Sequence, residues 1–364
     1  MAKKEIYRKI ASSLIFLYLF FLSMKLMSSS FKMFGEDFSN NLIFLTSDPF
    51  VALFIGILVT SVAQSSSFTT SLVVGLVASG CLTLGGAIPI VLGANIGTTV
   101  TNTIVSISHI CKKSEFKRAF EAAILHDIHN VLAVILFFPL ELKFHFLEKA
   151  SVFITGAIFN SWSMSETIAR GSFSSPLSYV LNPIVNILKD IFSGNPLLLA
   201  IISLAMLFLS LSSFVKILKP LVKTEFKEVI HNSIFKSHKR SFIFGILLTA
   251  FAQSSSVTTS LIIPFAGLGI LQLEAIYPYV LGANIGTTIT ALLVAFTLGS
   301  YAAVTVAMAH CLFNIFGSII IYPFRIIPIS IATKIGDTAL TSRIIPIVYI
   351  AVMFFLVPLL IVFF

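Results

Sequence analysis

The sequence contains two copies of one long pattern, separated by a constant distance. GILVTSVAQSSSFTTSLVVG at residues 56–75 returns as GILLTAFAQSSSVTTSLIIP at 245–264, and IPIVLGANIGTTVT at 88–101 returns as YPYVLGANIGTTIT at 277–290. Both pairs of segments are 189 residues apart. A repeat of this length in an apolar chain is typical of membrane proteins that fold as two homologous halves.

Composition indicates whether water or a membrane surrounds these halves. Apolar residues make up 57% of the 364 residues and charged residues 11%, and the mean hydropathy is +1.01. A soluble protein of this size needs more polar surface to cover its core, so the chain is predicted to be an integral membrane protein. The basic residues form short stretches without interleaved aromatics, which argues against nucleic acid as a partner. The cysteines Cys81, Cys111 and Cys311 are isolated and predict neither disulfides nor a metal site.

Apolar stretches long enough to cross a bilayer recur along the chain. About 20 helical residues span the hydrocarbon, and such stretches are expected near 11–31, 82–107, 119–139, 195–217, 273–298, 302–323 and 344–364. The first could be a cleaved signal peptide, but Lys25 and the poor cleavage context favour a retained helix. Most Lys and Arg residues lie within 1–10, 111–118, 216–240 and 325–343. These stretches and the N-terminus are therefore expected to face the cytoplasm, in a multi-pass protein surrounded by the lipid of the cell membrane.

The segments around the two QSSS motifs are too short to span the membrane. Residues 51–63 give roughly 20 Å of helix against about 30 Å of hydrocarbon. Each copy is therefore predicted to be a re-entrant helical hairpin with QSSS at its tip. The two tips are expected to meet inside the protein near the midplane, where their backbone groups can be satisfied.

The predicted fold class is an all-α integral membrane protein of two inverted-topology repeats, each with a re-entrant helical hairpin and a transmembrane helix broken at GANIGTT. The segment 141–193 is mixed and is expected to include surface amphipathic or re-entrant pieces. The predicted division is an N-terminal transmembrane helix (1–40), repeat 1 (41–140), a connecting segment and helix (141–218), a basic cytoplasmic linker (219–240), repeat 2 (241–325) and a C-terminal loop and helix (326–364).

The QSSS residues are candidates for an anion site. The serines open the second arm of each hairpin, where first-turn N–H groups are unpaired and the helix dipole is positive, and phosphate or sulfate fits such a position. Serines that only pack helices, bonded to i−4 carbonyls, are the structural alternative. A serine nucleophile is disfavoured because neither copy has a His or Lys base nearby. The predicted phosphate ligands are Gln64, Ser65, Ser66, Ser67, Gln253, Ser254, Ser255 and Ser256.

The GANIGTT segments offer neutral oxygen atoms of the kind that hard cations bind. Sodium fits such ligands and is released readily from them, whereas glycines that only allow close helix packing are the alternative interpretation. The predicted sodium ligands are Asn95, Thr98, Thr99, Asn284, Thr287, Thr288 and Thr290, together with Gln253 and Ser254.

A third repeated pattern is HDIHN at 126–130 and HCLFN at 310–314. At a spacing of four residues, His and Asn share one helix face. Asp127 has no acidic counterpart in the second half, and a carboxylate within a membrane span is a functional candidate. Arg118 could take part in the site or in a charge network at the cytoplasmic edge. The secondary candidates are Asp127, Asn130, Asn314 and Arg118.

With QSSS, GANIGTT and HxxxN in the same order in both halves, the chain resembles the type II sodium-dependent phosphate cotransporters, from about Tyr18 to its end. The resemblance implies a symporter, not an enzyme, that imports inorganic phosphate with sodium ions by alternating access and needs no organic cofactor. It also implies a homodimer, phosphate at the hairpin tips and sodium at the QSSS and GANIGTT regions. The compact segment 141–193 in place of a large extracellular loop favours a bacterial source.

Other functions stay open from the residues alone. Sulfate or a dicarboxylate is a rival substrate, because hydroxyl and N–H donors bind oxyanions similarly. A phosphate sensor that does not transport would keep the tips, and a sodium channel would keep the oxygen ligands. Two positions depart from the resemblance: Ala283 replaces a serine, and Lys112 stands where electrogenic members carry an acidic residue. Lys112 therefore favours electroneutral transport, unless it only lies at the membrane surface.

Overall fold

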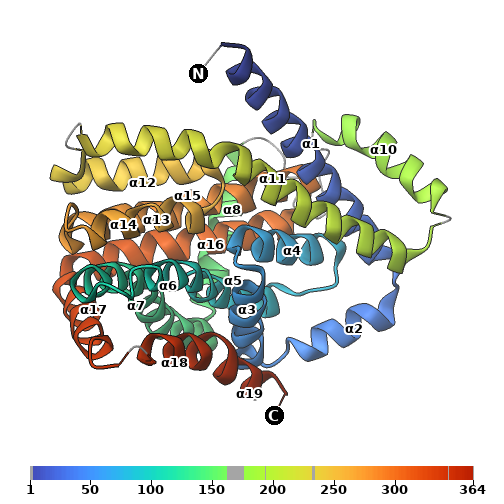
Figure 1. Cartoon of the computed structure of the whole chain (residues 1–364). Helices are drawn as coiled ribbons and strands as arrows, with labels where there is room; N and C mark the ends of the chain where they lie inside the picture. Colours follow the sequence, from blue (N-terminus) through green and yellow to red (C-terminus); the bar gives the residue numbers. More distant parts are fainter. Residues whose placement is uncertain (1–2, 162–175, 193, 232–233, 343, 364) are drawn as a thin grey trace.

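The computed structural model describes residues 3–161, 176–192, 194–231, 234–342 and 344–363, and helices are the only regular elements in these residues (Figure 1). The elements of the first half and the connection are α1 (Lys3–Met33), α2 (Glu36–Leu45), α3 (Pro49–Ala63), α4 (Ser66–Ser79), α5 (Leu84–Gly97), α6 (Val100–Ile107), α7 (Lys113–Phe144), α8 (Phe146–Ser161), α10 (Ser178–Ile191) and α11 (Pro196–His231). Those that follow are η1 (Ile234–Lys236), α12 (His238–Ala252), α13 (Ser255–Ser260), α14 (Ile262–Gly267), α15 (Leu273–Leu298), α16 (Tyr301–Ile321), η2 (Tyr322–Phe324), α17 (Ile326–Ala339), α18 (Ile345–Ala351), η3 (Val352–Leu356) and α19 (Val357–Phe363).

Seven helical stretches of the described chain are long and apolar enough to cross a membrane. They are Ala11–Met33, Leu84–Ile107, Lys113–Phe144, Pro196–Leu218, Leu273–Leu298, Tyr301–Phe324 and Ile345–Phe363. Each overlaps one of the seven spans expected from the sequence, and that prediction is confirmed. Helices α2 and α3 meet at an angle of 97° and add an eighth crossing if they are counted as one bent span. The chain is a multi-pass membrane protein.

Each half contains a pair of helices whose backbones almost touch. In the first half α3 lies against α5, and in the second half α12 lies against α15. A Cβ atom added at Gly93 would lie 1.9 Å from the carbonyl oxygen of Leu53, and one added at Gly282 would lie 2.1 Å from that of Phe242. Only glycine allows so close an approach. The glycines of both GANIGTT motifs therefore dock the first arm of a hairpin onto the helix that carries the motif.

The predicted break at GANIGTT is wrong for the second half. Helix α15 continues without interruption through Gly282, Asn284 and Gly286. In the first half only Thr98 and Thr99 separate α5 from α6, and both keep nearly helical φ and ψ angles. The contact with α12 gives the second-half glycines a packing role, so these residues favour tight docking instead of an opened backbone.

The two halves interlock instead of lying side by side as separate units. The second arm of the first hairpin, α4, packs against α15 and α16 of the second half. The corresponding segment of the second half, α13 with α14, packs against α6 and α7 of the first half, and these helices run alongside one another in Figure 1. This exchange brings the two QSSS motifs to one place in the interior.

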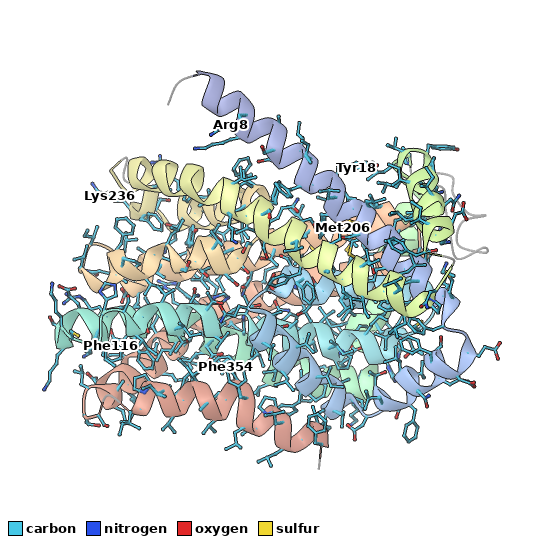
Figure 2. All side chains as sticks on the ribbon, turned by 45° about the vertical axis from the view of Figure 1, so that its right-hand side comes forward. Arg8, Tyr18, Phe116, Met206, Lys236 and Phe354 are labelled. Carbon is cyan, nitrogen blue, oxygen red and sulfur yellow. The ribbon has the colours of Figure 1, made fainter. Side chains whose placement is uncertain are left out.

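The connecting segment forms two helices shorter than a membrane span. Helix α8 packs against α7 and α16, and α10 packs against α1. Both have fewer than the roughly 20 residues that cross the hydrocarbon, and part of the mixed stretch, 162–175, lies outside the described residues. Helix α11 continues past its apolar part to His231, so most of the basic linker is helical. Figure 2 shows Arg8 on the end of α1 that projects beyond the rest of the bundle.

Candidate transport site

Both hairpin tips have the same backbone geometry. Gln64 has φ 51° and ψ 31°, and Gln253 has φ 50° and ψ 28°, which is the left-handed conformation that residues other than glycine seldom adopt. The serine that follows each of them, Ser65 or Ser254, is extended and caps the next helix. Each serine hydroxyl accepts from the backbone N–H three residues further on, at 3.2 and 3.3 Å. Because such strained residues often occur at functional sites, the matched pair is a candidate site.

The two tips are in contact, as the sequence predicts. The Ser67 hydroxyl donates to the backbone carbonyl oxygen of Gln253 at 2.9 Å. In the reciprocal contact the Ser256 hydroxyl lies 3.5 Å from the carbonyl oxygen of Gln64. The third serine of each triplet therefore ties one tip to the other.

The middle serines are the donors left available at the tips. Ser66 and Ser255 are 4% and 3% exposed, and within the described residues only their carbonyl oxygens take part in hydrogen bonds, with threonines one turn further on. Their side chains stand at the first turn of α4 and α13, where backbone N–H groups lack helical acceptors. In the part of the chain that the structure describes, no Lys or Arg side chain bonds to either tip. An anion bound here is contacted by neutral donors only, so the positive charge that balances it has to come from another source.

The Asn of the first GANIGTT motif is held by the HxxxN motif of the second half. The side-chain oxygen of Asn95 lies 3.4 Å from His310 Nε2 and accepts from Asn314 Nδ2 at 3.3 Å. These contacts join α5 to α16.

The second motif is held reciprocally by α7. The side-chain oxygen of Asn284 lies 2.7 Å from His126 Nε2, and its amide group donates to Asn130 Oδ1 at 2.7 Å. The Asn130 amide also donates to the backbone oxygen of Asn95 at 2.6 Å, which links the two networks. The structure therefore brings the predicted residues Asn95, Asn284, Asn130 and Asn314 together.

Several predicted sodium ligands keep an oxygen without a partner. The Gln253 Oε1, Thr287 Oγ1 and Thr290 Oγ1 atoms are buried and have no hydrogen-bond partner among the described residues. Buried polar atoms are almost always paired, so these three oxygens call for an occupant. Thr98 and Thr288 instead donate to the carbonyl oxygens of Ala94 and Ile285, at 2.8 and 2.7 Å, which leaves their lone pairs able to bind a cation.

Thr101 is a further candidate residue that sequence reasoning missed. Its buried hydroxyl oxygen also lacks a partner, and it lies 189 residues before Thr290, so the repeat itself contains the signal. A Cβ atom at Gly97 would lie 3.2 Å from the backbone N of Ser61, and one at Gly286 would lie 3.1 Å from that of Ala250. In both halves, therefore, the glycine four residues before the threonine packs against the last turn of the hairpin's first arm.

Asp127 is fully buried and both of its oxygens are hydrogen-bonded. Oδ1 accepts from the Thr99 hydroxyl at 2.9 Å, and Oδ2 accepts from the Tyr349 hydroxyl. Tyr349 belongs to α18 in the C-terminal segment and was missed by sequence reasoning. A tyrosine inside an apolar span is the available signal, because its hydroxyl needs a partner.

Arg118 does not lie with the tips. Its Nε and Nη2 atoms donate to the carbonyl oxygen of Gly267, at 2.9 and 2.7 Å, and so bind the end of α14. Along α7 it lies about 14 Å before Asp127. Lys112 is 70% exposed and pairs with Glu115 at 2.9 Å, which agrees with a position at the membrane surface.

These observations define the class of protein: a multi-pass membrane protein with a polar, largely neutral interior site built from two homologous halves. The chain belongs to the Na+/Pi-cotransporter family, whose sequence profile matches residues 19–163 and 206–321. It is 32% identical to sodium-dependent phosphate transport protein 2B of Homo sapiens over 94% of this chain and 63% of that protein. It is 33% identical to sodium-dependent phosphate transport protein 2A of Rattus norvegicus over 96% of this chain and 66% of that protein. No solved structure matches the chain.

The chain thus spans about two thirds of the length of these relatives or slightly less. Their names describe transport proteins, in agreement with the prediction that the chain is not an enzyme. Membership in this family confirms the resemblance that the repeated motifs indicate.

Proposed function

We propose that the chain is a sodium-coupled symporter that imports inorganic phosphate, held between the two QSSS tips. The observation that carries the proposal is the pair of buried, unengaged hydroxyls of Ser66 and Ser255, which stand at two helix N-termini that meet in the interior. Relatives named as sodium-dependent phosphate transport proteins support phosphate over sulfate or a dicarboxylate.

Sodium has two roles in this proposal. Its positive charge offsets the cost of placing a phosphate anion among neutral groups, since no basic side chain among the described residues bonds to the tips. The buried, unpartnered oxygens of Gln253, Thr287, Thr290 and Thr101 are the sodium ligands that we propose. Cation and anion then stabilise each other, which is the basis of coupling.

Alternating access by two inverted repeats is the transport mechanism that we infer. The matched tip geometry and the reciprocal Asn contacts support two equivalent halves. The tips nevertheless differ in accessibility, because Gln64 is exposed and Gln253 is 7% exposed. A site with one tip open and the other covered is expected for a transporter in a state that opens to one side.

The remaining parts of the proposal concern the setting of the protein. We place it in the cell membrane with the N-terminus in the cytoplasm, since basic residues concentrate on that side. We also propose a homodimer, in keeping with the family resemblance. Cysteine labelling in intact cells checks the orientation, and native mass spectrometry checks the dimer.

Uptake of labelled phosphate into proteoliposomes tests the proposed function. An inward sodium gradient is expected to drive accumulation that choline does not support, and excess sulfate or succinate is expected to leave the uptake unchanged. Inhibition by sulfate or succinate would assign another substrate. Phosphate binding without any uptake would favour a sensor.

A further inference from the structure

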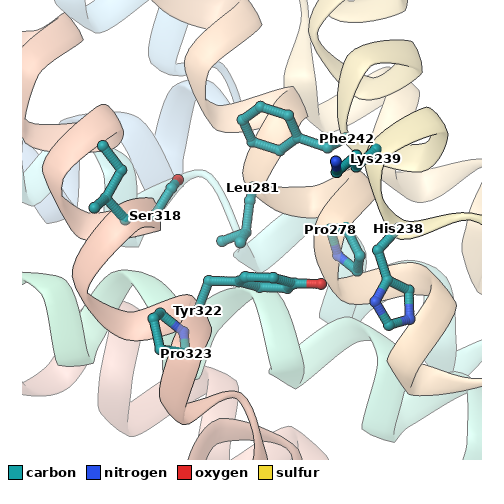
Figure 3. Close-up of a pocket in the computed structure, with 9 residues that line it drawn as sticks. His238, Lys239, Phe242, Pro278, Leu281, Ser318, Tyr322 and Pro323 are labelled. Carbon is teal, nitrogen blue, oxygen red and sulfur yellow. The ribbon is translucent and has the colours of Figure 1, made fainter.

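A pocket of about 280 Å³ lies on the flank of the molecule, between α12, α15 and α16 (Figure 3). Its walls are mainly apolar and include Phe242, Leu281 and Ile319. Ile319 is 65% exposed and the adjoining Phe324 is 62% exposed. The pocket therefore opens onto apolar surface that faces lipid in a membrane protein, and we call it the flank pocket.

One end of the flank pocket is basic. His238 and Lys239, at the start of α12, are exposed and line it, and the structure gives them no ion pair within the described residues. The His238 ring stands nearly perpendicular to the Tyr322 ring at 6.4 Å, and Arg325 lies 5.5 Å from the centre of the same ring. Figure 3 shows Tyr322 between His238 and the apolar walls. None of the nine residues drawn in the pocket is acidic, so this end attracts an anion.

The pocket also contains an unsatisfied hydroxyl. Ser318 is 5% exposed, lines the pocket, and its Oγ atom has no hydrogen-bond partner in the part of the chain that the structure describes. A buried hydroxyl without a partner is unusual in a packed interior. It suits a ligand that carries an acceptor oxygen into an otherwise apolar space.

We propose that the flank pocket binds an anionic phospholipid. The phosphate group lies against Lys239 and His238, an acyl chain follows the apolar walls, and the Ser318 hydroxyl donates to an ester carbonyl oxygen between them. Free phosphate fits poorly because the walls are apolar, and a neutral lipid leaves the basic end uncompensated. The inference does not depend on which solute the protein transports.

The position of this lipid connects it to the transport site. Helix α12 begins at the basic end of the flank pocket and ends at Ala252, immediately before Gln253, and α16 carries Asn314 one turn before Ser318. A lipid in the pocket therefore contacts two helices that hold the candidate site. Its binding is expected to change the rate at which the second hairpin moves.

Native mass spectrometry of the purified full chain tests the proposal, with phosphatidylglycerol and phosphatidylcholine as probes. Wild type is expected to retain phosphatidylglycerol in preference to phosphatidylcholine. The double variant His238→Gln with Lys239→Gln is expected to lower the affinity for phosphatidylglycerol roughly tenfold or more, since each basic residue near a headgroup contributes. Arg240→Gln is the matched control, because Arg240 is exposed and adjacent but does not line the pocket.

A second variant tests the apolar part. Ile319→Trp fills the mouth of the pocket from an exposed position and is expected to reduce retention while the basic end stays intact; thermal unfolding checks that it is folded. Equal retention in wild type and the basic double variant would overturn the proposal. An equal loss of retention in Arg240→Gln would also overturn the proposal, because it would indicate an effect of diffuse surface charge. Displacement of the lipid by inorganic phosphate at matched concentration would overturn it too, because it would indicate a site for free phosphate.

Discussion

The three serines of each tip have different tasks at the residue scale. The first caps its helix, the third bonds to the opposite tip, and the middle one keeps a free hydroxyl. The alternative of serines that only pack helices accounts for the first and third but not for the second. Ser66 and Ser255 are therefore the residues on which the phosphate proposal depends most.

Ser66→Ala and Ser255→Ala are each expected to weaken phosphate binding by about 1–3 kcal/mol, because each removes a donor from a buried anion. Isothermal titration calorimetry on folded protein measures the change. Ser79→Ala, at the far end of α4, is the matched control and is expected to bind normally. Unchanged affinity in both tip variants would mean that these serines do not bind phosphate.

The unpartnered threonine oxygens give a separate prediction for sodium. Thr287→Val and Thr101→Val keep the side-chain shape but remove an oxygen, so each is expected to raise the sodium concentration for half-maximal uptake roughly tenfold. Asn95→Ala is expected to act in the same direction. Thr297→Val, on α15 but with its hydroxyl bonded to Leu293, is the control. If sodium activation is the same in the threonine variants and wild type, these oxygens are not ligands.

Among the helices, the main feature is two pairs whose backbones touch at glycine residues. Gly93 allows α5 to touch α3, and Gly282 allows α15 to touch α12. Each hairpin therefore has its first arm fixed to a membrane helix of its own half, while its second arm contacts the other half. This arrangement favours movement of each hairpin together with its partner helix.

Gly93→Ala is expected to destabilise the protein by about 3 kcal/mol or more, because the new methyl group meets backbone and not a flexible side chain. The melting temperature Tm in detergent measures this loss. Gly85→Ala in the same helix adds a methyl group into open space and is expected to leave Tm unchanged. A Gly93→Ala variant as stable as wild type would contradict the packing role.

Repeat and hydropathy patterns were sufficient to predict the seven spans and the meeting of the tips. They did not predict that α15 is continuous, because glycines that open a helix and glycines that dock two helices look alike in sequence. The bond between Tyr349 and Asp127 joins distant segments, so neither local pattern nor spacing indicates it. Thr101 could have been predicted, because it lies 189 residues before Thr290, which is the constant distance between the two repeats. The sequence alone is compatible with two positions for Arg118, in the transport site or at the cytoplasmic edge. The structure shows that it bonds to Gly267.

At the scale of the whole molecule, two similar halves interlock around one site but expose it unequally. Gln64 is exposed and Gln253 is buried, although their backbone angles agree within a few degrees. A single rigid pore offers no reason for such a difference between equivalent positions. The alternating access that we propose would account for it, because the two tips then exchange their accessibility between two states.

Cysteine labelling tests this exchange in a background that lacks the three native cysteines. In the state described by the structure, Gln64→Cys is expected to react with a water-soluble maleimide many times faster than Gln253→Cys. Transport conditions with sodium and phosphate are expected to raise the reactivity of Gln253→Cys from the opposite side of the membrane. Labelling of both positions from one side only would contradict alternating access.

In the proposed mechanism, sodium supplies the positive charge that balances a phosphate bound at the two tips. Calorimetric titration of phosphate into the purified protein, in sodium buffer and in choline buffer of equal ionic strength, tests it most directly. We expect tight phosphate binding in sodium buffer and strongly weakened binding in choline buffer, with an equal effect of phosphate on sodium affinity because coupling is reciprocal. The same phosphate affinity in both buffers would contradict it.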